Sequence, residues 1–132
     1  MQHSRLVEWE RNLKQMLDRL DDYLEDRYGD KYNLHPARPQ RGRTANKSHD
    51  GLFDIVGSFT LGLGSDIGRG YIIDIRMSTL DHIPKEIENT IEAEAVEFLL
   101  ERLPKFFPGK NLSVSMDNHV IKLHGDLSLG TL

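Results

Sequence analysis

The first 28 residues carry the clearest hydrophobic pattern of the chain. Between residues 4 and 28, large apolar side chains recur at alternating steps of three and four, and no Gly or Pro interrupts them. The set is Leu6, Trp9, Leu13, Met16, Leu20 and Tyr23, with Leu17 and Leu24 beside it. This spacing predicts an amphipathic helix that ends before Gly29. Because the apolar stripe is wider than a coiled-coil seam, we expect the helix to pack on a sheet or another globular partner.

Two later stretches alternate with the period of two that is typical of strands. Residues 53–61 place apolar side chains on one face, and residues 71–78 repeat the alternation after a glycine-rich stretch. These stretches predict a β-hairpin. Pairing Phe59 with Ile73 keeps both apolar sets on one side of the sheet, as the pleat requires of any correct register.

A second amphipathic helix is predicted over residues 84–103. Pro84 suits the first turn of a helix, and Pro104 is expected to end it. Glu88 and Glu92 lie one turn apart at the border of its apolar stripe. Two like charges at this spacing are mildly unfavourable, so they indicate either a cationic partner or the solvated edge of the helix.

A second hairpin follows the second helix. Residues 112–116 alternate apolar with polar side chains, and Asp117 and Asn118 are a candidate two-residue turn. That turn would place Val114 opposite Ile121, with the apolar faces coinciding.

The element order is therefore helix, strand, strand, helix, strand, strand. It predicts an α+β two-layer fold in which a four-stranded antiparallel sheet of two hairpins is covered on one face by two helices, in the order α-β-β-α-β-β. We divide the chain into the N-terminal amphipathic helix (1–29), a basic tether containing Pro and Arg (30–51) and a ββαββ core (52–132), which forms one domain with the helix. A length of 132 residues suits a single domain.

Composition narrows the class of protein. The chain is acidic, with a net charge of −4, and has no cysteine. The absence of cysteine excludes disulfides, thiolate zinc sites, iron–sulfur clusters and a cysteine nucleophile. No apolar run resembles a signal peptide or a membrane span, so we expect a cytoplasmic protein that does not bind membranes. The sequence also lacks the spacing of common metal and nucleophile motifs, so no catalytic residue, metal or cofactor is predicted.

The tether concentrates positive charge. Residues 36–50 hold four Lys/Arg against one Asp, and the four are Arg38, Arg41, Arg43 and Lys47. An Arg-rich flexible segment can fold onto RNA or onto an acidic protein surface. No aromatic residues alternate with the arginines to stack on bases. The alternative is a solvated linker that its own charge holds to the acidic remainder of the chain.

The glycine-rich stretch 62–70 is a candidate phosphate or small-ligand loop, through Gly64, Ser65, Gly68 and Arg69. Its third glycine stands one place too late for a dinucleotide fingerprint, and a strand follows instead of a helix. The alternative is a hairpin loop whose glycines supply positive φ angles.

The outward face of the sheet is a further candidate ligand surface. Asp74 and Arg76 are predicted to share it with Lys122 and His124. In the predicted register, Asp74 lies opposite Ser58. The alternative is an ordinary solvent-facing sheet with ion pairs across its strands.

The leading functional hypothesis is a non-enzymatic protein-interaction or oligomerisation domain that self-associates through its N-terminal helix. The expected partner is a second copy of the chain or another protein. Its predicted contacts are Trp9, Leu13, Met16, Leu20 and Tyr23 on the helix and Arg38, Arg41, Arg43 and Lys47 on the tether. The alternatives are a nucleic-acid-associated protein that uses the tether and a phosphate or small-ligand domain at the glycine-rich loop.

Overall fold

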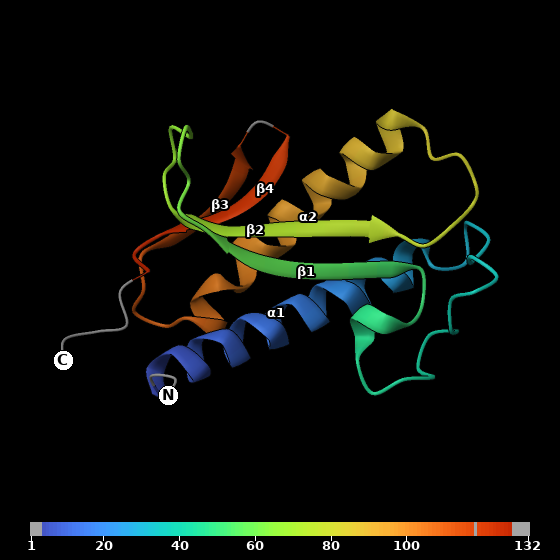
Figure 1. Ribbon diagram of the computed structural model, residues 1–132, viewed down its shortest axis with the longest axis horizontal. Coiled ribbons are helices and arrows are strands. Elements are labelled where there is room, and N and C mark those ends of the chain that lie inside the picture. The colour runs from blue at the N-terminus through green and yellow to red at the C-terminus, as the bar shows by residue number, and fades with distance from the viewer. Residues whose placement is uncertain (1–3, 118, 128–132) are drawn as a thin grey trace.

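Four antiparallel strands form one sheet, and two long helices cover one of its faces (Figure 1). The computed structural model describes residues 4–117 and 119–127. In chain order the elements are α1 (Ser4–Tyr28), the 3-10 helix η1 (Lys47–His49), β1 (Phe53–Thr60), β2 (Gly70–Met77), α2 (Lys85–Phe106), β3 (Leu112–Asp117) and β4 (Val120–Gly125). The predicted α+β architecture and its α-β-β-α-β-β order are confirmed. Among the described residues, neither helix has the apolar length that a membrane span would need.

The core lies between the helices and the apolar face of the sheet. Met16, Leu20 and Leu24 of α1 have no exposed surface. At one end of the helix, the Trp9 ring stacks on Tyr71 with 4.7 Å between ring centroids, and Phe107 lies at the same distance from Trp9. These contacts join α1 to β2 and to the end of α2. The first helix is therefore an integral layer of the domain.

Strand order explains how the two hairpins form one sheet. The order is β1-β2-β4-β3, so β2 and β4 meet at the centre, and β1 and β3 are the edges. The second hairpin thus joins the first along β2, and the length of that junction determines how much of β2 is covered.

Both hairpins pair two residues away from the predicted register. Phe59 lies opposite Tyr71, and Val114 lies opposite Leu123. The second strand pair closes at Asp117 and Val120, which places the turn one residue later than predicted. A shift of two residues leaves every side chain on its original face, so the hydrophobic pattern cannot distinguish the two registers.

Helix α2 also runs further than predicted. It continues through Pro104 to Phe106, and the N–H of Phe107 donates to the carbonyl of Leu103 at 2.8 Å. The proline lies in the last turn, where few later hydrogen bonds depend on it, so the helix ends three residues beyond the predicted position.

Candidate functional site

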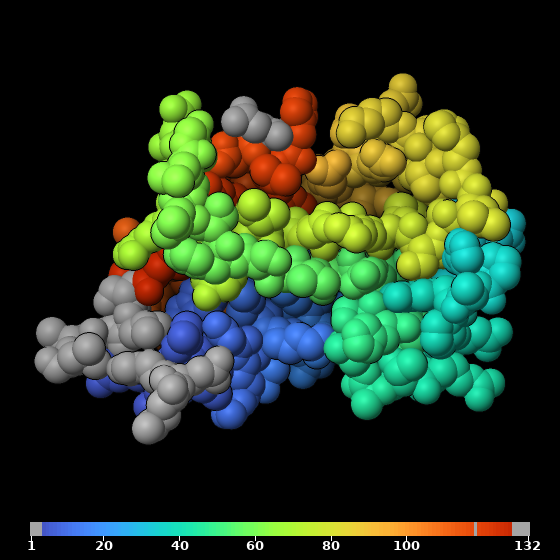
Figure 2. All heavy atoms as spheres, in the orientation of Figure 1, coloured from blue at the N-terminus to red at the C-terminus, as the bar shows by residue number. Residues whose placement is uncertain are grey.

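The two neighbours of β2 differ in length. β2 pairs with β1 over all eight of its residues but with β4 over only three, Tyr71, Ile72 and Ile73. Residues 74–77 therefore have a neighbouring strand on one side only. We call the space on the other side the notch. It is a cavity of about 590 Å³ between the second half of β2, the start of β4 and the first half of α2. Figure 2 shows the surface hollowed between these elements.

The backbone of Ile75 faces the notch. The N–H of Ser78 donates to the carbonyl of Leu52 at 2.7 Å, which makes Leu52 and Ser78 a hydrogen-bonded pair at the end of the β1–β2 ladder. In an antiparallel ladder such pairs alternate along the strands, so every second residue of β2 directs its N–H and C=O away from β1. By this alternation, Ile75 directs both groups toward the side that β4 does not reach.

Two further contacts fit this alternation. Phe53, the partner of Met77, directs its N–H away from β2 and donates it to the Glu25 carboxylate at 2.8 Å. The carbonyl of Met77 is directed away from β1 and accepts the N–H of Thr79 at 3.1 Å. Within the described chain, Ile75 is therefore the β2 residue whose N–H and C=O both remain open to an added strand.

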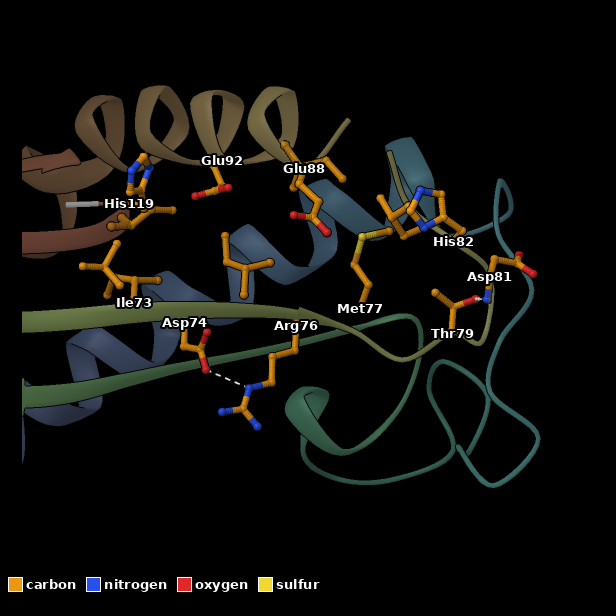
Figure 3. Close-up of a pocket in the computed structure, with 15 residues that line it drawn as sticks. Ile73, Asp74, Arg76, Met77, Thr79, Asp81, His82, Glu88, Glu92 and His119 are labelled. Carbon is orange, nitrogen blue, oxygen red and sulfur yellow. Dashed lines mark hydrogen bonds and ion pairs between the residues drawn. The ribbon is translucent and has the colours of Figure 1, made fainter. Parts of the chain in front are cut away.

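Helix α2 gives the notch an acidic wall. Figure 3 shows Glu88 and Glu92 extending from α2 toward β2, and the buried Ile91 of the same helix also lines the notch. The Glu88 carboxylate lies 3.5 Å from the Lys85 ammonium, and that lysine side chain is itself 71% exposed. No other described residue forms an ion pair or hydrogen bond with the carboxylate of Glu92. The notch thus places two carboxylates one helical turn apart, opposite an unpaired strand edge.

The remaining lining residues vary in chemistry. Ile73, Ile75, Met77 and Ile91 supply an apolar floor, and His82 and His119 lie at its two ends (Figure 3). Among the described residues, no group of three or more His, Asp or Glu side chains is arranged to hold a metal ion.

The tether is an ordered segment that binds to its own chain. Figure 2 shows it in cyan and blue-green against the blue α1. Arg41 reaches Asp26 at 2.9 Å and Asp22 at 3.2 Å, and Lys47 lies 2.9 Å from Asp22. These ion pairs fit the predicted alternative in which positive charge holds the tether to the acidic remainder of the chain.

Arg38 has a different role from the other basic residues of the tether. Its Nε donates to the carbonyl of Gly51 at 3.0 Å, and its Nη2 lies 2.7 Å from the carbonyl of Ser48. The carbonyls of Asp50 and Phe53 are each 3.1 Å from the same nitrogen. Arg38 therefore holds together the main chain of residues 48–53, which leads into β1. The Arg43 side chain is exposed, and among the described residues its guanidinium makes no hydrogen bond or ion pair, although its backbone N–H donates to the carbonyl of Gln40 at 3.1 Å.

Two neighbouring carboxylates of α1 that face the tether have pKa values shifted in opposite directions. Burial, together with the neighbouring charges of Glu25 and Asp22, raises the pKa of Asp21 to about 8. Burial also acts to raise the pKa of Asp22, but hydrogen bonds from Lys47 and Arg41 outweigh it and lower that pKa. The tether thus neutralises part of an acidic helix face.

The glycine-rich loop folds onto the sheet. Ser65 turns inward, where its hydroxyl donates to the Asp117 carboxylate at 2.5 Å and lies 3.3 Å from the Lys122 ammonium. Gly64 and Gly68 have φ angles of 81° and 86°, as expected of the hairpin-loop alternative. The Ser65 hydroxyl is thus already bonded to the anionic Asp117 carboxylate. Arg69 is exposed, so the two polar side chains of this predicted set differ: Ser65 is bonded to the sheet and Arg69 faces solvent.

The polar residues of the outer sheet face bind different partners. Asp74 and Arg76 form an exposed ion pair at 2.8 Å, directed away from α2 (Figure 3). Asp74 lies opposite Val56, and the predicted Ser58 is two residues further along β1. Lys122 is buried beneath the glycine-rich loop, and His124 hydrogen-bonds Ser115 at 2.8 Å. Asp74 and Arg76 thus bind each other, while Lys122 and His124 are each bonded to other residues of the sheet and loop.

The predicted contacts on α1 lie inside the fold. Trp9, Leu13, Met16 and Leu20 are buried against the sheet and α2. Tyr23 is partly exposed, and its ring lies 4.7 Å from that of Phe98. In this arrangement the stripe completes the core of its own chain.

Sequence patterns did not indicate the notch as a site. Two features of the sequence are related to it. The alternating pattern of β2 is longer than that of β4, and Glu88 and Glu92 lie at the border of the apolar stripe of α2. The notch becomes visible only once the register shows where β4 begins.

The fold and the notch define a two-layer α+β domain with an open sheet edge beside an acidic helix. The chain belongs to a family described as "Uncharacterised protein", which matches residues 4–125. It is similar to an uncharacterized protein of Borreliella burgdorferi (strain ATCC 35210 / DSM 4680 / CIP 102532 / B31), with 39% identity over 125 residues that make up 95% of this chain and 98% of the relative. No solved structure matches the chain. Because the family match runs from α1 to the end of β4, the helix and the tether belong to the shared unit.

Proposed function

We propose that this protein is a protein-interaction domain that binds an extended segment of a partner polypeptide as an added strand on the open edge of β2. The observation that carries the proposal is the backbone of Ile75, whose N–H and C=O face the notch with no strand beside them. Unpaired strand edges are templates for another chain, and strand addition is a recurrent mode of peptide recognition.

The dimensions of the notch suit a single strand. Neighbouring strands lie about 4.7–4.9 Å apart, and about 590 Å³ falls within the range of small ligand and peptide pockets. The start of β4 closes one end of the notch, and α2 covers its inner side. An added strand would thus replace the section of β4 that is absent beside residues 74–77. Main-chain hydrogen bonds would supply affinity, and the walls would select side chains.

This proposal keeps the class of function predicted from the sequence and moves the contact surface from α1 to the notch. Self-association remains one form of it, in which the added strand comes from a second copy of the chain. The nucleic-acid alternative has less support, because Arg38, Arg41 and Lys47 already bind groups of their own chain.

The test uses the full-length protein and a library of random ten-residue peptides displayed on phage. Enriched peptides are synthesised, and amide hydrogen exchange is measured residue by residue with and without them. The proposal predicts that bound peptides slow the exchange of the Ile75 amide. A selection that enriches no peptide, or peptides that leave the Ile75 amide unprotected, would contradict it.

A proline substitution provides the matched variant. Ile75→Pro removes an N–H that is directed into the notch and leaves the hydrogen bonds of the β1 ladder in place, so the fold should survive. Binding should fall at least about tenfold, while Ile75→Val, which keeps the N–H, should bind as the original chain does. If Ile75→Pro fails to fold, peptides N-methylated at alternate positions test the same hydrogen bonds from the other partner, and equal affinity of methylated and unmethylated peptides would then contradict strand addition.

A further inference from the structure

We infer that the strand captured in the notch carries Lys or Arg at the positions that face α2. This inference rests on the proposed capture of a strand beside β2 and names the chemistry of that strand. It depends on which side chains of an added strand would face α2 and on which groups of α2 would contact them.

The pleat determines which side chains enter the notch. Tyr71, Ile73, Ile75 and Met77 alternate along β2 on the side that faces the helices, and Asp74 and Arg76 point to the other side (Figure 3). A strand added beside β2 continues the same pleat, so every second side chain would lie between β2 and α2. The residues between them would lie on the solvent side.

The helix offers those inward side chains two carboxylates. Glu88 and Glu92 extend into the notch from successive turns (Figure 3). Residues four apart on a helix are separated by about 6 Å along its axis, and alternate residues of a strand by about 6.6–6.8 Å. Two successive inward side chains could therefore each reach one carboxylate.

The floor of the notch favours a cation on a long aliphatic stem. Ile75 and Met77 are partly buried, and Ile91 is only 2% exposed. Lys and Arg cover apolar surface with their methylene groups and keep the charged head at the polar rim. An inward Asp or Glu would meet two like charges, and an inward Leu would remove water from the Glu92 carboxylate without replacing its hydrogen bonds.

The outer side of the added strand should show no such preference. Asp74 and Arg76 lie there as a mutually compensating ion pair, at 2.8 Å. The expected recognition pattern is thus an alternation in which the inward residues are basic and the outward residues are free to vary.

Three synthetic peptides test the inference. Each has seven residues, an acetylated N-terminus and an amidated C-terminus, with Val alternating with Lys, with Gln or with Glu. Binding to the full-length chain is measured by titration calorimetry at low salt, with hydrogen exchange at Ile75 as the site readout. The Lys peptide should bind at least about tenfold more tightly than the Gln peptide, and the difference should shrink as salt is added. The Glu peptide should bind more weakly than the Gln peptide.

Variants of α2 test whether Glu88 and Glu92 are the groups that cause the preference for Lys. Glu88→Gln combined with Glu92→Gln should abolish the preference for Lys over Gln, read as the ratio of the two affinities in the same variant. The matched control is Glu97→Gln combined with Glu101→Gln, which removes the same charge at the same spacing from the exposed side of α2. This control should keep the preference.

The possible results separate the two proposals. If all three peptides protect Ile75 with equal affinity, strand capture stands and the basic preference is wrong. If none of them protects Ile75, the basic preference is wrong, and the library selection decides strand capture separately. If the preference for Lys survives the replacement of Glu88 and Glu92, the inference is overturned, because the charge that selects lies elsewhere.

Discussion

The ammonium of Lys122 lies 3.2 Å from the carboxylate of Asp117, and the lysine side chain is only 2% exposed. Both residues belong to the sheet face that does not pack on the helices, where an ion pair would normally meet water. The glycine-rich loop covers them, with the Ser65 hydroxyl bonded to Asp117. Hydrogen bonds from Ser65 and then Lys122 lower the pKa of Asp117. The loop is therefore held to β3 and β4 by a shielded polar cluster.

Lys122→Met should destabilise the protein and loosen the loop. The variant keeps the apolar stem of the side chain but leaves the Asp117 carboxylate beneath the loop without its cation, and the loss of one partner of a buried charge pair is strongly destabilising. We expect the melting temperature to fall by about 5–10 °C, with faster amide exchange at residues 62–68. Thermal unfolding and hydrogen exchange measure both effects.

The double variant Lys122→Met with Asp117→Asn provides the control. Because it removes the negative charge together with the positive one, it should recover part of the lost stability. If the double variant is less stable than the sum of the two single variants predicts, the pair does not act as a shielded charge pair.

Side-chain periodicity predicted the elements of this fold correctly because burial acts on the pattern directly. Each buried face of a strand or helix repeats with the period of its backbone, as at Phe53, Ile55 and Ile73. Register is different. Phe59 opposite Ile73 and Phe59 opposite Tyr71 bury the same faces, so the choice between them depends on the backbone of the glycine-rich loop, which the pattern does not describe.

The candidate site depends on strand register, which side-chain periodicity does not determine. The notch exists because β4 begins at Val120 and reaches β2 only as far as Ile73, and a change of register by two residues would alter its length. Burial of Lys122 was likewise unpredictable, because alternation places it on the solvent side and only the folded loop covers it. The spacing of Glu88 and Glu92 was visible in the sequence, but the sequence could not show that they face the uncovered half of β2.

Arg38→Met should detach the tether from the start of β1. The guanidinium lies within 3.1 Å of four main-chain carbonyls, including those of Ser48 and Gly51. Methionine keeps the length of the side chain without its donors, so these carbonyls lose partners that water must replace. The free energy of unfolding should fall by about 2–4 kcal/mol in urea titrations. Arg43→Met is the matched control and should change it by less than about 0.5 kcal/mol; similar losses in the two variants would contradict the role assigned to Arg38.

Gly70→Ala should be far more harmful than Gly57→Ala, although both glycines lie in strands of the same pair. A Cβ at position 70 would lie 2.4 Å from the carbonyl oxygen of Leu123, which is main chain and cannot move away without opening the β2–β4 junction. A Cβ at position 57 would meet the methyl ends of Leu17 and Leu13 at 3.2 and 3.3 Å, and these can shift. Thermal unfolding should show a fall of more than about 5 °C for Gly70→Ala and a smaller change for Gly57→Ala; equal changes would contradict the close approach at position 70.

Asp21→Asn should stabilise the protein, and increasingly so as the pH rises. The pKa of Asp21 is raised from its ordinary value of 3.8 to about 8, by burial first and then by Glu25 and Asp22, while Lys47 acts in the opposite direction. Between these two values the folded chain holds a proton that the unfolded chain has released, so the free energy of unfolding falls as the pH rises from about 4 to about 8. Asparagine removes this dependence. Its advantage should be near zero at pH 4 and reach a few kcal/mol, order of magnitude, at pH 8 and above, in urea titrations at each pH.

Asp22→Asn should behave in the opposite way, although the two residues are adjacent. Hydrogen bonds from Lys47 and Arg41 outweigh burial and lower the pKa of Asp22, so its carboxylate stabilises the fold above the ordinary aspartate pKa, and this contribution is lost as the pH falls through the lowered value. The variant should therefore be less stable than the original chain at pH 7 and equal to it in strong acid. Opposite signs at neutral pH would establish that the tether compensates one carboxylate of α1 and leaves its neighbour uncompensated, whereas equal signs would contradict that division.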